Sequence, residues 1–323
     1  MNAGIDLGYS AVKTVSGDRR FQFPSVVGTP DKARFALCLQ NGNIVLSVPG
    51  DGDCLVGDGA VEQSRFIGRR EDRNWIASDE YHRLLLAAFT ELTKATSVEL
   101  TIVTGLPIAF YSDKDALKDR ILGEHLVTRK GRGAQRFKVT DARVIPQPFG
   151  ALLSMALDDK GRVRDSDLAT GSVGIVDVGG KTTNLLSAHR LAEVGRETTS
   201  VNVGAWDMVR AIRQYLAENC PNLELRDHQI IDAIVARKTK YYGDLVDIGS
   251  AVDAALEPMA DQVIAQATQL WNGGASLDAI LVAGGGALLL GSAIKAHFRH
   301  ARVVEDPVFA NAIGYWKFAQ RIG

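Results

Sequence analysis

The stretch Gly4-Ile5-Asp6-Leu7-Gly8-Tyr9-Ser10-Ala11-Val12-Lys13 has a counterpart about 170 residues later, Gly174-Ile175-Val176-Asp177-Val178-Gly179-Gly180-Lys181-Thr182-Thr183. Each begins as an apolar run, which predicts a buried strand, and ends in an aspartate beside a glycine turn. A return strand is expected after each turn, over residues 11–16 and 184–187. The sequence therefore predicts two hairpins of one design, the second of which belongs to a second domain.

These two turns hold residue types that suit phosphate and magnesium. Backbone N–H groups reach a phosphate where glycine leaves no Cβ in the way, and Mg²⁺ prefers carboxylate oxygens, often through retained waters. Asp-X-Gly is also a common hairpin tip, so either turn alone is better explained as structural. Their pairing favours a phosphate site. Lys13 stands in the first return strand, where its ammonium could reach a phosphate, and a solvated strand lysine is the alternative.

A third feature is the loop Gly284-Gly285-Gly286, which follows an apolar strand over residues 279–282 and precedes a helix over residues 287–298. Glycine backbone there would let a flat ligand lie on the main chain, and a packing turn is the alternative. The chain has no Gly-X-Gly-X-X-Gly, Walker A or kinase-type glycine loop, which argues against P-loop and Rossmann chemistry.

Length and composition set the broad class. A chain of 323 residues is expected to form about two domains. A formal net charge of -1 gives no bulk positive field for a polyanion, so direct nucleic-acid binding is not favoured. Cys38, Cys54 and Cys220 are scattered, which fits a reduced, cytoplasmic setting. Neither a standard export signal nor a membrane span is predicted.

The remaining pattern alternates helices with strands, which indicates an α/β fold. A small inserted subdomain is expected over about residues 28–75, with strand-like pieces at 35–39 and 44–48. The apolar stripe of residues 247–270 is interpreted as core. The basic stretch 129–136 is expected to be a solvated loop. Further helices are expected over residues 81–96, 114–126, 149–157, 206–218 and 227–238, and strands over residues 100–103 and 137–145.

Five motifs, taken in order, resemble those of the actin, sugar-kinase and heat-shock-chaperone superfamily. Residues 6–13 are similar to the first phosphate motif and Gln147-Pro148 to the first connecting motif. Residues 177–183 are similar to the second phosphate motif, Gly284 to Gly286 to the adenosine motif, and Asn311-Ala312-Ile313-Gly314 to the second connecting motif. The resemblance spans almost the whole chain.

Within that superfamily the chain looks like the bacterial and archaeal actins of the ParM (StbA) plasmid-segregation type. The segments Phe23-Pro24-Ser25 and Thr104-Gly105-Leu106-Pro107 and the compact length carry this likeness. Two positions depart from the pattern: Gln147 is closer to actin than to the acidic residue of the best-known ParM, and Tyr9 stands where many members have serine or threonine.

The resemblance implies an α/β, actin-like (ribonuclease H-like) fold with two duplicated domains around a nucleotide cleft. The first domain would comprise residues 1–147 plus 311–323, and the second residues 148–310. Asp6 and Asp177 would hold Mg²⁺ through water, and Gln147 would position the attacking water. Asp6, Gln147 and Asp177 are therefore the expected catalytic residues. The expected nucleotide-binding residues are Gly8, Tyr9, Ser10, Lys13, Gly179, Gly180, Lys181, Thr182, Thr183, Gly204, Lys238, Gly284, Gly285, Gly286 and Asn311. For Lys238, an exposed lysine on a surface helix is the simpler interpretation.

The function implied by the resemblance is that of an actin-like ATPase that uses ATP and Mg²⁺ and polymerises into filaments for plasmid or DNA segregation. The implied partners are further copies of the chain and a DNA-binding adaptor of the ParR type, with DNA contacted only indirectly and no membrane involved. The alternative is a small-molecule (sugar or acid) kinase of the same superfamily. Such a kinase needs an aspartate base near the cleft, and Asp141 is a weak candidate for it. A chaperone would need an appended peptide-binding domain.

Overall fold

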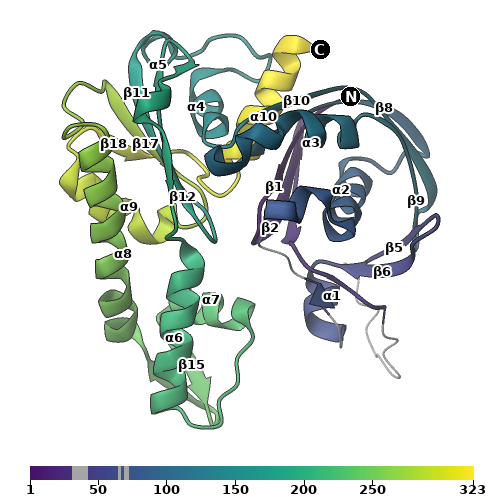
Figure 1. The fold of residues 1–323 in the computed structure, drawn as a ribbon. Coiled ribbons are helices and arrows are strands. Elements are labelled where there is room, and N and C mark those ends of the chain that lie inside the picture. Colours follow the sequence, from purple (N-terminus) through teal and green to yellow (C-terminus); the bar gives the residue numbers. More distant parts are fainter. Residues whose placement is uncertain (31–42, 65–66, 69–72) are drawn as a thin grey trace. The chain divides into compact units, whose positions relative to one another are not determined.

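The computed structural model describes residues 1–30, 43–64, 67–68 and 73–323. These residues divide into two compact units (Figure 1). Unit 1 comprises Met1–Thr170 and Val308–Gly323, and unit 2 comprises Gly171–Pro307. Among the described residues, no helix combines the length and the apolar character needed to cross a bilayer.

The described part of unit 1 is built on a ten-stranded sheet in the order β3-β2-β1-β8-β10-β9-β5-β6-β4-β7. Its centre is parallel, since β1 and β10 both run parallel to β8, whereas β1 and β2 form the predicted antiparallel hairpin. The sheet curls around helix α2 (Figure 1). The strands are β1 Asn2–Leu7, β2 Ala11–Ser16, β3 Arg19–Pro24, β4 Val27–Gly28, β5 Ile44–Val48, β6 Gly52–Val56, β7 Ile67–Gly68, β8 Ser97–Leu106, β9 Gly123–Arg129 and β10 Gly133–Pro146.

Helix α2 (Asp79–Leu92) fills the hollow of this sheet. Ser78 caps its first turn by accepting a hydrogen bond from the Tyr81 N–H group at 3.1 Å. Residues 84–90 are all buried, so the helix is covered on every side rather than along one stripe. The smaller helices of unit 1 are α1 Asp58–Gln63, η1 Arg73–Ala77, η2 Ile108–Asp113, α3 Lys114–Ile121 and α5 Ser166–Thr170.

Two further helices of unit 1, α4 (Phe149–Ala156) and α10 (Ala310–Ile322), pack on each other, and α10 also packs on β1 and β8. Glycines permit the close approach. A Cβ on Gly4 would lie 2.1 Å from the Ala312 carbonyl oxygen, and a Cβ on Gly314 would lie 1.8 Å from that of Gly150. The Lys317 ammonium donates to the carbonyl oxygens of Ser154 and Leu157 at 2.7 and 2.8 Å, which satisfies the end of α4.

Unit 2 contains a six-stranded sheet in which β11 and β12 form the second predicted hairpin and β17 runs parallel to β11. The predicted core stripe on α8 is confirmed, because Val252, Met259 and Val263 are buried in the core of this unit. The elements are β11 Ser172–Val178, β12 Thr183–His189, β13 Ala192–Glu193, η3 Gly195–Glu197, β14 Thr199–Val201, α6 Ala205–Asn219, α7 Asp227–Ala236, β15 Lys238–Tyr241, β16 Asp244–Asp247, α8 Gly249–Leu270, β17 Ala279–Ala283, α9 Ala287–His297 and β18 Ala301–Val303.

The unit boundaries differ from the predicted ones at 147/148 and 310/311. Residues 148–170 belong to unit 1, because α4 is locked against α10 through Gly150 and Gly314. In the described part of the inserted subdomain expected near residues 28–75, Leu55 and Ala60 form a small cluster of their own with Val26, while other residues join the main core of unit 1. Strand β5 pairs with β9, and Leu46 and Val56 are buried in the core of unit 1. The strand-like piece at 35–39 lies outside the described residues.

Two predictions for residues 114–136 are wrong. The helix ends at Ile121 and β9 follows, where buried His125, Val127 and Arg129 alternate with exposed residues as in a strand packed on one face. The basic stretch is not a solvated loop throughout: residues 130–132 form the turn between β9 and β10, whereas Arg129 is buried and forms an ion pair with Glu91. The charges that suggested solvent satisfy a buried carboxylate instead.

Candidate functional site

The first hairpin brings Asp6 and Lys13 opposite each other. The β1–β2 register pairs Asp6 with Lys13 and Leu7 with Val12. The Gly8 N–H group closes the turn by donating to the Ala11 carbonyl oxygen at 3.2 Å. Residues directly opposite in an antiparallel pair share one face of the sheet. The Lys13 ammonium accordingly donates to Asp6 Oδ2 at 3.1 Å.

Gln147 joins this pair from the end of β10. Its Nε2 donates to Asp6 Oδ1 at 3.0 Å, so both oxygens of a carboxylate that is 2% exposed are held. The Gln147 N–H group donates to the Leu106 carbonyl oxygen at 2.7 Å, which continues the pairing with β8 beyond Pro146. Asp6, Lys13 and Gln147 were each predicted as site residues, and the structure brings them together.

Ser25 braces the turn of the first hairpin, a role that the sequence pattern did not indicate. Its N–H donates to the Ser10 carbonyl oxygen at 3.0 Å, and its Oγ donates to that of Gly8 at 2.5 Å. Ser25 is almost fully buried. The only signal for it was the Phe23-Pro24-Ser25 resemblance, which assigned no role to the serine.

An aromatic row accounts for the unusual Tyr9. Its ring centroid lies 5.9 Å from that of Trp75, which in turn meets Tyr81 edge-on at 5.6 Å. Tyr9 thereby packs against the core of unit 1. Burial raises the pKa of Tyr81, the Arg120 charge opposes this shift, and the Asp6 charge adds to it. The Tyr81 phenol therefore stays neutral beside the Asp6 carboxylate.

The second hairpin repeats the first in its register. Asp177 pairs with Asn184 and Val178 with Thr183, and the Gly179 N–H group donates to the Thr182 carbonyl oxygen at 2.9 Å. Asn184 therefore holds the place that Lys13 holds in the first hairpin. It is buried, and Ser200 Oγ donates to its Oδ1 at 2.7 Å. The duplicated hairpins thus differ in charge, with an ammonium opposite one aspartate and an amide opposite the other.

The start of α6 supports the second turn. The N–H groups of Ala205 and Trp206 donate to the carbonyl oxygens of Gly179 and Gly180 at 3.0 and 2.8 Å. A Cβ on Gly204 would lie 2.4 Å from the Gly180 carbonyl oxygen, so this position requires glycine. The Gly204 N–H group itself donates to the Asp207 carboxylate at 2.9 Å.

Thr183 and the three glycines after β17 surround the same turn. The buried Thr183 hydroxyl donates to the Val203 carbonyl oxygen at 2.8 Å. Gly284 adopts φ +83°, and a Cβ there would lie 2.3 Å from the Val178 carbonyl oxygen and 2.6 Å from Asp177 Oδ1. A Cβ on Gly286 would lie 2.3 Å from Val178 Cγ1. A Cβ on Gly285 would meet no atom of the described residues within 4 Å. Two of these glycines serve packing, and the middle one borders open space.

The other predicted residues lie in different surroundings. Ser10, Lys181 and Thr182 lie in the two hairpin turns and are partly exposed. Asn311 is buried, and its Cα would lie 2.5 Å from a Cβ on Gly150. Lys238 is exposed and opens β15 in a separate two-stranded sheet, so the helix position expected for it is wrong.

The described residues contain no group of three or more His, Cys, Asp or Glu side chains that could hold a metal ion. Single carboxylates such as Asp6 and Asp177 suit Mg²⁺, which keeps several waters and is bound through one or two carboxylates together with substrate phosphates. Each of these carboxylates by itself therefore suits a magnesium ion that arrives with a phosphate ligand.

Family models match both halves of the chain. Residues 4–150 match the N-terminal domain of actin-like proteins, and residues 175–296 match the C-terminal domain of the archaeal, MreB-like actin homologues. Each match contains one of the two hairpins. Among curated proteins, none matches the chain.

Solved structures of similar fold cover nearly the whole chain. One is a 15-stranded ParM filament from Clostridium botulinum, with 25% identity and a TM-score of 0.82 over 99% of each chain. An archaeal actin homologue in complex with ADP has 22% identity and a TM-score of 0.82 over 99% of each chain. ParM from Bacillus thuringiensis with ATP has 15% identity and a TM-score of 0.73, again over 99% of each chain. With both domains matched, the chain belongs to the actin-like proteins and has the fold shared by ParM and the archaeal actin homologues.

Proposed function

We propose that this protein is an actin-like ATPase that hydrolyses Mg-ATP and polymerises in a nucleotide-dependent manner. The observation that carries the proposal is the cluster of Asp6, Lys13 and Gln147, in which a cation and an amide converge on one buried carboxylate at a glycine turn. The ADP and ATP complexes of the similar structures support the choice of nucleotide. When bound, Mg-ATP would supply the phosphoryl group and the metal that offsets its charge.

Each residue of the cluster has a role that its chemistry permits. Gln147 is a poor base, so it would orient a water molecule by hydrogen bonding rather than take its proton. Lys13 would offset negative charge on the phosphoryl group. Asp6, together with Asp177 of the second hairpin, would hold Mg²⁺ through water. In the structure Asp6 accepts hydrogen bonds from both Lys13 and Gln147, so it orients these two side chains.

The remaining predicted residues divide into direct and supporting contacts. Thr183, Gly204, Gly284 and Gly286 would act indirectly, because their contacts already shape the second turn. Gly285 has the open space that a ligand needs. The proposed direct contacts to the nucleotide are Gly8, Tyr9, Ser10, Lys13, Gly179, Gly180, Lys181, Thr182 and Gly285.

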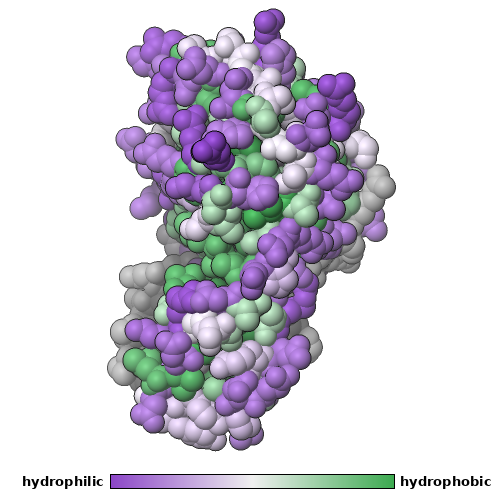
Figure 2. All heavy atoms as spheres, turned by 90° about the vertical axis from the view of Figure 1, so that its left-hand side faces the viewer, coloured by the Kyte–Doolittle hydropathy of each residue, from purple (hydrophilic) through white to green (hydrophobic). Residues whose placement is uncertain are grey.

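Polymerisation is supported by the filament-forming relative and by exposed apolar side chains on unit 2. Val235 and Ile231 on α7 and Leu245 on β16 are exposed. On a different face of unit 2, Figure 2 shows further apolar atoms among polar ones. Exposed apolar patches of this kind often mark contacts between proteins.

A role in plasmid or DNA segregation, with a DNA-binding adaptor of the ParR type and a cytoplasmic location, completes the proposal. The adaptor would contact the DNA, since the chain has a formal net charge of -1. The kinase alternative is not favoured, because both halves of the chain match actin-like families.

The test is phosphate release measured together with pelleting, across a series of protein concentrations, with ATP and Mg²⁺ and no phosphoryl acceptor. We expect release to rise above a critical concentration together with pelleted protein. Gln147→Ala should slow release by at least about tenfold while ATP affinity changes little, because an orienting hydrogen bond acts mainly in the transition state. Monomer at every concentration would reject polymerisation, and unchanged turnover in Gln147→Ala would reject the role of Gln147.

A further inference from the structure

The main chain of Gln147 is held from three directions within unit 1. Its N–H donates to the Leu106 carbonyl oxygen at 2.7 Å. Its carbonyl oxygen accepts two hydrogen bonds, from the Gly150 N–H group at 3.1 Å and from the Tyr315 hydroxyl at 3.0 Å. The first two bonds join neighbours in the β8–β10 sheet and the turn into α4. The third comes from α10, which is remote in sequence.

Local sequence also restricts Gln147. It lies between Pro146 and Pro148, and a following proline disfavours the helical backbone conformation of the residue before it. Fixing both the N–H and the C=O of such a residue fixes the direction of its Cα–Cβ bond. The side chain then needs only its own rotamer to place Nε2 on Asp6 Oδ1, which it does at 3.0 Å.

The space for the Tyr315 side chain is made by two glycines. A Cβ on Gly105 would lie 1.9 Å from the Tyr315 hydroxyl oxygen, and a Cβ on Gly150 would lie 2.7 Å from its Cε1. Tyr315 is fully buried, among Val103 and Ala319. A buried phenol needs a hydrogen-bond partner, and phenylalanine would fill the same apolar volume without that requirement. The hydroxyl is therefore the part of this side chain that packing does not explain.

We infer that Tyr315 is a positioning residue for Gln147: its hydroxyl fixes the Gln147 carbonyl and thereby aims the amide that orients the attacking water. The inference rests on the proposed ATPase function and adds a residue of α10 to its machinery. Tyr315 does not touch the substrate. A lost constraint should therefore reduce turnover and leave nucleotide binding almost unchanged, since small misplacement of a reacting group affects the transition state more than the ground state.

The variant that tests this is Tyr315→Phe, which removes one oxygen atom and keeps the ring. Tyr111→Phe is the matched control, because the Tyr111 hydroxyl likewise donates to a main-chain carbonyl oxygen, that of Val144 on strand β10, three residues before Gln147, at 3.3 Å. With protein in excess over Mg-ATP, we expect Tyr315→Phe to lower the rate of single-turnover hydrolysis about three- to tenfold. The affinity for a fluorescent ATP analogue should change less than about twofold. Tyr111→Phe should behave like the wild type.

A double-mutant cycle separates positioning from general damage to the fold. If Tyr315 acts through Gln147, Tyr315→Phe has no further effect on hydrolysis in a Gln147→Ala background. An equal loss in both backgrounds would overturn the inference. So would wild-type turnover in Tyr315→Phe alongside a clear loss in Gln147→Ala.

A second readout does not depend on hydrolysis. The side-chain amide resonance of Gln147, identified by its absence in Gln147→Ala, should shift in Tyr315→Phe and stay in place in Tyr111→Phe. An unmoved resonance in Tyr315→Phe would overturn the inference. If the wild type does not hydrolyse ATP but the Gln147 resonance still shifts in Tyr315→Phe, the proposed function is rejected and the positioning contact is kept.

Discussion

At the scale of single residues, the loop Gly284-Gly285-Gly286 shows that neighbouring glycines can have different structural roles. Gly284 has a positive φ and contacts Val178 and Asp177 so closely that a Cβ would overlap them. Gly285 has no such neighbour among the described residues. The first glycine maintains the shape of the loop behind Asp177, and the second leaves the backbone accessible.

Alanine substitutions separate these two roles. Gly284→Ala should destabilise unit 2 by at least about 2 kcal/mol, because a left-handed alanine is strained and its Cβ has no room. Gly285→Ala should change stability by no more than about 0.5 kcal/mol and weaken ATP binding, if a ligand lies on that backbone. Urea unfolding and ATP titration of both variants measure the effects. Equal loss of stability in the two would contradict this division.

A histidine pair in unit 1, in which His125 is buried and His82 is partly buried, should make stability depend on pH. Burial lowers the pKa of both His82 and His125, and each ring lies within 6.0 Å of the other. His125 is held by Ile121, whose carbonyl oxygen lies 2.8 Å from its Nε2. The unfolded chain, with a histidine pKa near about 6.5, then binds more protons than the folded one. The contribution of the neutral pair to the free energy of unfolding is fully present above that pH. It is lost as the pH falls through the lower pKa values of the folded state.

We expect the urea concentration at the unfolding midpoint to decrease as the pH is lowered from about 7 to about 5. The decrease should be smaller in His125→Gln, because glutamine does not titrate. The glutamine keeps an N–H donor for the Ile121 carbonyl oxygen. If His125→Gln lost as much stability as the wild type over this range, the histidine pair would not be the cause.

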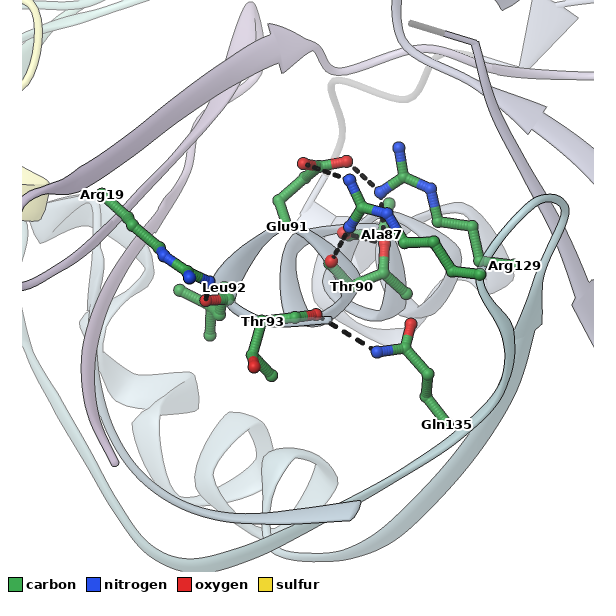
Figure 3. A network of polar contacts seen from close by, with 9 residues as sticks. Arg19, Ala87, Thr90, Glu91, Leu92, Thr93, Arg129 and Gln135 are labelled. Atoms are coloured by element: carbon green, nitrogen blue, oxygen red, sulfur yellow. Dashed lines mark hydrogen bonds and ion pairs between the residues drawn. The ribbon is translucent and has the colours of Figure 1, made fainter. Parts of the chain in front are cut away.

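At the scale of elements, the end of α2 shows how the curled sheet is closed around its helix (Figure 3). The last carbonyl groups of a helix lack partners within it. Arg19 donates to the Leu92 oxygen at 3.1 Å, and Gln135 donates to the oxygens of Thr93 and Ala95 at 3.1 and 2.9 Å. These donors come from β3 and β10, so strands that are distant in the sheet order meet at one helix end.

Glu91 anchors the same network through ion pairs with Arg129 and Arg132. Its side chain is 5% exposed and that of Arg129 is 7% exposed. Glu91→Gln leaves the Arg129 charge buried without a carboxylate and should cost about 3 kcal/mol. Glu124→Gln breaks the exposed pair with Arg136 and should cost less than about 1 kcal/mol. Chemical denaturation compares the two, and similar costs would show that burial does not set the strength of the Glu91 network.

At the scale of the whole molecule, each unit contributes one hairpin with the same register and a different cross-strand partner. If both hairpins bind one Mg-ATP, as the proposed function requires, damage to either should remove the stabilisation by the ligand. Wild-type protein at a ligand concentration of about 100 times Kd should gain about 2.7 kcal/mol.

Asp6→Asn and Asp177→Asn test this with thermal unfolding in the presence and absence of Mg-ATP. Each single variant should lose most of the rise in Tm, because each removes a carboxylate from its hairpin. A full rise in Tm in either variant would show that its hairpin does not contribute to the nucleotide site.

Much of the candidate site could be predicted because its signals are local. An apolar run, an aspartate, a glycine turn and a return strand are read within about ten residues, and hydrogen bonds between near neighbours fix their geometry. For the same reason Gly284 to Gly286 are recognisable from their immediate neighbours in the chain, whereas Gln147 was identified only through the resemblance to the family's connecting motif. The inward alternation of β9 was also present in the sequence, but its first residues were assigned to the helix expected over residues 114–126 and its last residue to a basic loop.

Tertiary structure alone decided how these pieces are held. Ser25 braces the first turn, Tyr315 holds Gln147, and Arg129 pairs with Glu91 across separations of 17, 168 and 38 residues. Such contacts have no periodicity, because nothing in the local chain depends on which distant residue supplies the donor. The sequence by itself therefore determined the two hairpins and the glycine loop, and packing determined which side chains hold them and that residues 148–170 belong to unit 1.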